Sequence, residues 1–149
     1  MTDTDKFPHP VYKETVLAPL FEGVKTHYAK HMGAINKAHL VMLRETNILS
    51  ADAARDIANT LQTIEAETDP EALEYTGEHE DYFFFIEAEL KRHLGDAGGA
   101  LHTARSRNDM DHTVFKLALQ ARAENLIAEL HTLAEVTLQK ARDEKATLI

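Results

Sequence analysis

Apolar residues recur at every third or fourth position along most of this chain, which is the pattern of amphipathic helices. Between about Leu20 and Arg44 they form one stripe, made of Phe21, Val24, Tyr28, Met32, Ile35, His39 and Met42. We expect a long helix there, starting after a break near Pro19, because proline lacks the backbone N–H that a helix interior needs. A second helix should follow Ser50, a typical N-cap residue, with a stripe made of Ala54, Ile57, Ala58, Leu61 and Ile64. The two segments predict an antiparallel helical hairpin.

A shorter helix is expected after a polar connection around Pro70, in the stretch EHEDYFFFIEAEL that begins at Glu78. Its continuous apolar run, residues 82–86, could also form a strand. Charged residues alternate afterwards with Leu90 and Leu94 at helical spacing, which favours a helix. Glycines at positions 95, 98 and 99 should end it.

The final segment predicts one long helix, because no glycine or proline occurs from Asn108 to the last residue. One face carries Phe115, Leu119, Leu126, Leu130, Leu133 and Thr137. A helix of about 40 residues would span about 60 Å, more than a globule of this size can cover, so it should need partner helices. The closing EKATLI has no cap signal, from which we expect the sequence to be part of a larger protein. The predicted class is all-α.

Composition narrows the classes of partner. The chain has 149 residues and a formal net charge of −9, with 25 acidic residues against 16 lysines and arginines and no long basic run, which argues against nucleic acid. It has no cysteine, no apolar run long enough for a membrane span and no basic-then-apolar leader at its start. These features favour a cytoplasmic protein that contacts no membrane.

Hydrogen-bond donors are concentrated in the stretch LHTARSRNDMDH, residues 101–112. Ser106 and Asp109 have the spacing of a capping pair, so the long helix should start there with free backbone amides. An arginine guanidinium can donate to both oxygens of a carboxylate, and the backbone amides at a helix N-terminus also bind anions. The side-chain donors near these amides are His102, Arg105, Ser106, Arg107 and Asn108. Gly98 and Gly99 could let a ligand approach the backbone. The alternative is a capped helix start whose arginines pair with nearby carboxylates.

The run HTARSRND, residues 102–109, together with GEHED and IEAEL about 20 residues earlier, resembles the first signature region of the argininosuccinate lyase family in the fumarase/aspartase superfamily. The resemblance implies an all-helical homotetramer with a central bundle of long helices and active sites built from three subunits. Residues 1–100 would be the N-terminal helical domain, and residues 101–149 the start of the bundle domain. The partner of the last helix would then be another copy of the chain.

By motif position, the resemblance implies that Ser106, Arg107 and Asn108 bind a carboxylate of the substrate's succinyl part. Thr103, Arg105 and His102 are further candidates. The implied reaction is reversible β-elimination of a C–N bond that releases fumarate, without cofactor or metal. The family's catalytic serine and histidine lie in signature regions that this sequence does not contain, so no catalytic residue is assigned and the chain alone should be inactive. Asp81 could orient an arginine of the loop.

One position departs from the family pattern. The acidic segment usually carries a substrate-contacting histidine where this chain has Phe83, and a phenyl ring cannot donate a hydrogen bond. The amine half of the substrate should therefore differ, and N-substituted aspartates, including aminopolycarboxylates, would be compatible. His27 and His31 have the i, i+4 spacing of a metal pair, but no third ligand is evident, so exposed helix-surface histidines are preferred. A stand-alone helical association module is the alternative from another class.

Overall fold

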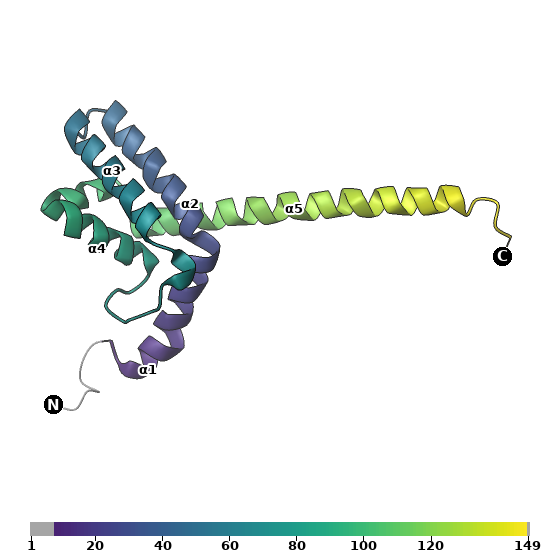
Figure 1. The fold of residues 1–149 in the computed structure, drawn as a ribbon, viewed down its shortest axis with the longest axis horizontal. Coiled ribbons are helices and arrows are strands. Elements are labelled where there is room, and N and C mark those ends of the chain that lie inside the picture. The colour runs from purple at the N-terminus through teal and green to yellow at the C-terminus, as the bar shows by residue number, and fades with distance from the viewer. Residues whose placement is uncertain (1–7, 149) are drawn as a thin grey trace.

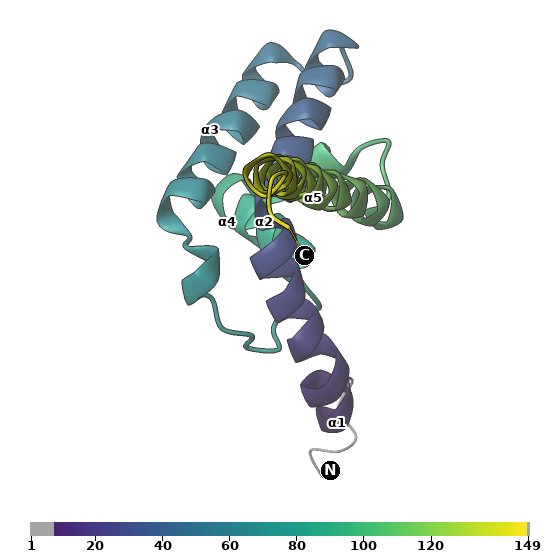
Figure 2. The same ribbon diagram turned by 90° about the vertical axis from the view of Figure 1, so that its right-hand side faces the viewer.

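The computed structural model describes residues 8–148, and within that range it consists of helices and loops without a strand (Figure 1). The predicted all-α class is therefore confirmed. In chain order the elements are α1 (Pro10–Tyr12), η2 (Lys13–Leu17), α2 (Ala18–Glu45), α3 (Ala51–Glu67), η3 (Pro70–Ala72), α4 (Tyr82–Leu94), η4 (Gly95–His102) and α5 (Arg107–Asp143). Helices α2, α3 and α4 pack together, and α5 crosses α2 and then leaves the cluster as a single rod (Figures 1 and 2).

The break expected near Pro19 is wrong. The helix begins at Pro10, and the backbone stays helical through η2, a π-helical segment, into α2. The wider turn is visible at Ala18, whose N–H bonds the carbonyl of Lys13 five residues earlier. Pro19 sits just after this turn, where the altered hydrogen-bond pattern accommodates its missing N–H, so the helix continues instead of ending.

The hairpin of α2 and α3 is present, and the Ser50 cap is confirmed because its hydroxyl accepts the Ala53 N–H at 3.2 Å. Its apolar core extends to α4 and η4 and comprises Leu40, Ala54, Ile57, Leu61, Ile64, Leu90 and Leu101. The buried face of α2 differs from the predicted stripe, because Lys25 and Asn36 are buried while His39 is only half-buried. Two polar side chains therefore occupy core positions of this helix.

Helix α4 confirms the helical interpretation of the aromatic run. Asp81 caps it by accepting the Phe84 N–H at 3.1 Å, and Gly95 follows its last residue at φ 61°. Gly98 allows η4 to pack directly on α4, since a Cβ there would lie 2.6 Å from the carbonyl carbon and oxygen of Leu90. The close approach at Gly98 therefore serves helix packing.

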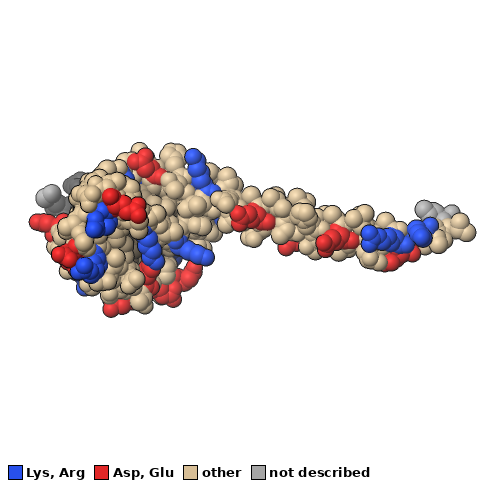
Figure 3. Space-filling model, turned by 90° about the horizontal axis from the view of Figure 1, so that it is seen from above, with Lys and Arg blue, Asp and Glu red and all other residues tan. Residues whose placement is uncertain are grey.

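Helix α5 starts where the capping pair predicted, but it ends at Asp143 and not at the last residue. Its 37 residues correspond to about 55 Å. Only the first turns are covered, with Met110, Val114 and Ala118 buried. Along the rod, large apolar side chains are exposed. Figure 3 shows its charged residues separated by stretches of uncharged ones on the face in view. No helix in residues 8–148 is both long and apolar enough to cross a membrane.

Candidate anion-binding site

The donor loop, residues 103–106, connects η4 to the N-terminus of α5. Ser106 and Asp109 form a complete capping box: the Asp109 N–H donates to the Ser106 hydroxyl at 3.3 Å, and the Ser106 N–H donates to the Asp109 carboxylate at 2.9 Å. The Ser106 hydroxyl also donates to the Asp109 carboxylate at 3.1 Å, and the bonds donated by the Ser106 N–H and hydroxyl lower the pKa of Asp109. The first amides of a helix have no intrahelical acceptor, so the end of α5 presents partial positive charge beside Arg107 and Asn108.

Arg107 is held by carboxylates on two sides. Its Nη2 forms an ion pair with Asp81, and its Nη1 lies 3.3 Å from an Asp111 oxygen. Its guanidinium carbon also lies 6.0 Å from the centroid of the Phe84 ring. Asp81 is 1% exposed and uses its other oxygen to cap α4, so one buried carboxylate joins the N-termini of α4 and α5. Asp81 therefore contacts Arg107, the first residue of α5; the role of Asp81 in orienting this arginine stays a prediction.

Arg105 points in a different direction from Arg107. It reaches α2, where its Nη2 donates to the side-chain oxygen of the buried Asn36 at 2.8 Å. Burial lowers the pKa of Arg105 to about 10, which leaves it charged at neutral pH. Its Nε and Nη1 atoms are buried without a hydrogen-bond partner among the described residues.

His102 and Phe83 pack against each other with ring centroids 4.8 Å apart. Nε2 of His102 lies 3.9 Å from a Glu87 oxygen. Burial, followed by the charge of Arg105, lowers the pKa of His102, so its neutral form is favoured. Phe83 is itself buried in the core, so the ring at this position is held by packing and faces His102.

The predicted site residues thus surround one loop but meet different partners. The Ser106 side chain is engaged in the cap, the two arginines are bound to α2 and to Asp81, and Asn108 is exposed. Thr103 contributes its carbonyl oxygen, which lies 2.9 Å from Nε2 of His39. The carboxylate-binding roles of these residues remain predictions.

Sequence reasoning missed Asn36 and His39, the two α2 residues that contact the loop. The available signal was a histidine within the otherwise apolar stripe and an asparagine directly after Ile35, one of its members. The histidine pair of the same helix, His27 and His31, belongs to no cluster of three or more potential metal ligands within residues 8–148.

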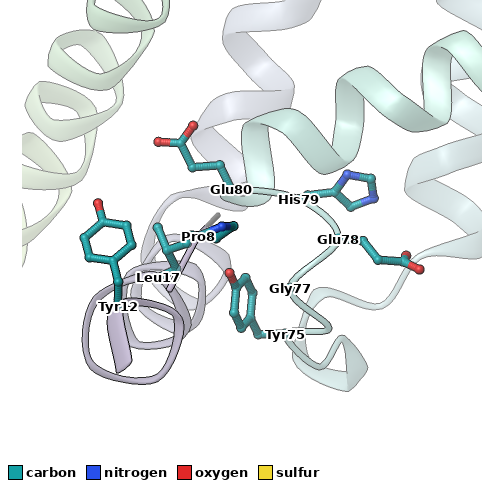
Figure 4. Close-up of a pocket in the computed structure, with 8 residues that line it drawn as sticks. All are labelled: Pro8, Tyr12, Leu17, Tyr75, Gly77, Glu78, His79 and Glu80. Atoms are coloured by element: carbon teal, nitrogen blue, oxygen red, sulfur yellow. The ribbon is translucent and has the colours of Figure 1, made fainter. Parts of the chain in front are cut away.

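A cavity of about 190 Å³ lies apart from the donor loop, between the first helix and residues 75–80. Figure 4 shows the Tyr75 hydroxyl and the Glu80 side chain near Leu17, while Glu78 and His79 extend to the other side. None of the residues lining the cavity belongs to the loop or to α5. Its lining therefore adds nothing to the carboxylate-binding set.

Comparison with known proteins gives consistent matches. The model of a family described as lyase matches residues 15–149. The chain is 52% identical over 149 residues to argininosuccinate lyase 2 of Agrobacterium fabrum, aligned over 99% of this chain and 30% of that protein. Argininosuccinate lyases of a Nitratiruptor species and a Chelativorans species are 38% and 37% identical over 112 residues, 75% of this chain and 24% of each relative. The chain spans less than a third of these relatives, and no solved structure matches it significantly.

Proposed function

Since this chain belongs to that lyase family, we propose that it forms the N-terminal part of an argininosuccinate lyase-like enzyme that cleaves a C–N bond by β-elimination and releases fumarate. Its contribution is to bind a carboxylate of the succinyl part through Arg107, Asn108 and the amides that follow Ser106. The observation that carries the proposal is the capped start of α5 beside an arginine fixed by a buried aspartate.

The chemistry requires stabilisation of negative charge. Removal of a proton beside a carboxylate generates a dianion before the C–N bond breaks, and donors fixed in advance lower the energy of such a species more than mobile ones. Asp81 and Asp111 restrict the Arg107 side chain, and the α5 dipole adds positive potential at the same end. The proton-transferring groups are expected outside this chain, so these residues bind and stabilise and do not transfer the proton.

Association with further copies of the chain is part of the proposal. The side chains of Phe115, Leu126, Leu130 and Leu133 on α5 are 54%, 61%, 54% and 62% exposed. A row of this kind along a helix matches the surface that packs in helical bundles. Bundling several α5 helices would bury the row and bring residues of other subunits to the N-terminus of α5, where the carboxylate is expected.

The proposed substrates are small N-substituted aspartates. A phenyl ring at position 83, packed on His102, supplies no hydrogen bond to the amine half, so that half should differ from the one bound by a histidine. We place the enzyme in the cytoplasm, because a sequence without cysteine fits a reducing compartment.

Succinate, the unreactive analogue of the succinyl part, provides the test. Succinate at ten times its dissociation constant should stabilise the protein by about 1.4 kcal/mol, or roughly 3–6 °C in melting temperature. Asn108→Ala removes an exposed donor and should reduce this shift, whereas Asn125→Ala, an equivalent change further along α5, should not. Sodium chloride at equal ionic strength controls for screening. An unchanged melting temperature in succinate, or equal shifts in both variants, would contradict the proposal.

A further inference from the structure

Two side chains of α2 hold the donor loop from one side. Asn36 accepts a hydrogen bond from Nη2 of Arg105 at 2.8 Å, and Nε2 of His39 lies 2.9 Å from the carbonyl oxygen of Thr103. Because a carbonyl oxygen can only accept, Nε2 of His39 must carry the proton. The two α2 residues are three positions apart, which places them on the same face of the helix.

Ala104, the residue between these two contacts, has an unusual backbone conformation. Its φ is 59°, in the left-handed region that residues with a Cβ seldom adopt. Such a conformation persists where the surroundings hold it, and the contacts to Thr103 and Arg105 bracket it on both sides. The reversal at Ala104 turns the chain from η4 into the first turn of α5.

Burial makes these contacts selective for one loop conformation. Asn36 is 4% exposed, and its side-chain oxygen accepts from Nη2 of Arg105. The other guanidinium nitrogens of Arg105, Nε and Nη1, have no hydrogen-bond partner among the described residues. If the loop moved, the Asn36 amide would lose its bond to a guanidinium within the core, and a buried unpaired group is costly. Neighbouring Leu40 and Leu43 are buried in the core, so α2 is a fixed support.

We infer that Asn36 and His39 are positioning residues, which hold Ala104 in its left-handed conformation and thereby set where Arg107, Asn108 and the α5 amides point. Neither residue has to touch the substrate. The consequence for ligand binding rests on the proposed function, whereas the consequence for loop conformation does not.

Paired variants separate the hydrogen bonds from general packing. Asn36→Leu and His39→Leu each remove one contact, whereas Asn36→Asp keeps an acceptor for Arg105 and His39→Gln keeps a donor near the position of Nε2. His27→Leu, an exposed histidine on the same helix, is the matched control. His39 is only half-buried, so its variants should fold even if Asn36→Leu does not.

Amide exchange and chemical shifts of residues 103–109 in the full chain report the loop directly. We expect faster exchange and shifted resonances there in the two leucine variants, and values close to wild type in Asn36→Asp, His39→Gln and His27→Leu. Succinate should bind about fivefold more weakly for each contact removed, the equivalent of about 1 kcal/mol.

Unchanged loop amides in both leucine variants would overturn the inference, as would altered amides with unchanged succinate affinity. Equal effects of His39→Leu and His39→Gln would also overturn it, because they would show that the hydrogen bond is not what holds the loop. If wild-type protein binds no succinate, the proposed function fails, and the amide measurements alone decide whether these residues position the loop.

Discussion

Asp81→Ala should cost this protein about 3 kcal/mol of unfolding free energy. Loss of an N-cap typically costs about 1 kcal/mol, and this carboxylate caps α4 through the Phe84 N–H. Loss of the hydrogen bond to Arg107 should cost about 2 kcal/mol, in the lower half of the range for hydrogen bonds to charged groups. The cost is moderate because the Arg107 side chain is 31% exposed and keeps its contact to Asp111. The melting temperature should fall by roughly 6–12 °C.

Asp81→Asn divides this cost into its parts. Asparagine keeps an oxygen that can cap α4 but loses the charge that attracts Arg107, so we expect a loss of about 2 kcal/mol. Urea unfolding monitored by near-ultraviolet circular dichroism is a suitable assay, because Tyr75 and Tyr82 belong to the aromatic cluster at Phe21 and report on packing near Asp81.

A double-mutant cycle with Arg107→Met tests the ion pair itself. Arg107→Met leaves the Asp81 carboxylate buried without its cation, so its effect and that of Asp81→Ala should not add. We expect a coupling free energy of about 1–2 kcal/mol. Additive effects within about 0.5 kcal/mol would refute the claim that Asp81 joins the two helix ends through Arg107.

Three further predictions concern other parts of the structure. Gly98→Ala should destabilise by about 2–3 kcal/mol because its Cβ would meet Leu90 backbone at 2.6 Å, whereas Gly23→Ala, with nothing within 4 Å, should stabilise α2 by up to about 1 kcal/mol in the same urea assay. The pKa of His102 is lowered below the ordinary 6.5, so the unfolded chain binds a proton at this residue more readily than the folded protein does. The free energy of unfolding should therefore fall as the pH drops below 6.5, and it should fall less steeply in His102→Gln. Leu130→Glu on α5 should reduce association in sedimentation velocity without lowering the stability of the α2–α4 cluster, and undiminished association would exclude this face from the interface.

Local patterns were sufficient to predict most helices. The caps at Ser50 and Ser106 and the end of α4 at Gly95 depend on residues a few positions apart, so the sequence contains all the information needed. Two helix boundaries differ from the prediction. A π-helical segment carries the first helix past Pro19, and α5 ends at Asp143, six residues before the sequence does.

The sequence by itself determined the all-helical class, the start of α5 and the concentration of donors ahead of it. Only the tertiary structure decided where these donors point: Arg107 to Asp81, 26 residues away, and Arg105 to Asn36, 69 residues away. It also placed Lys25 on the buried face of α2, where Nζ donates to the carbonyl oxygen of Leu73. Helix periodicity records which residues share a face, but it does not show the partners that Lys25 and Asn36 find 48 and 69 residues away in the sequence.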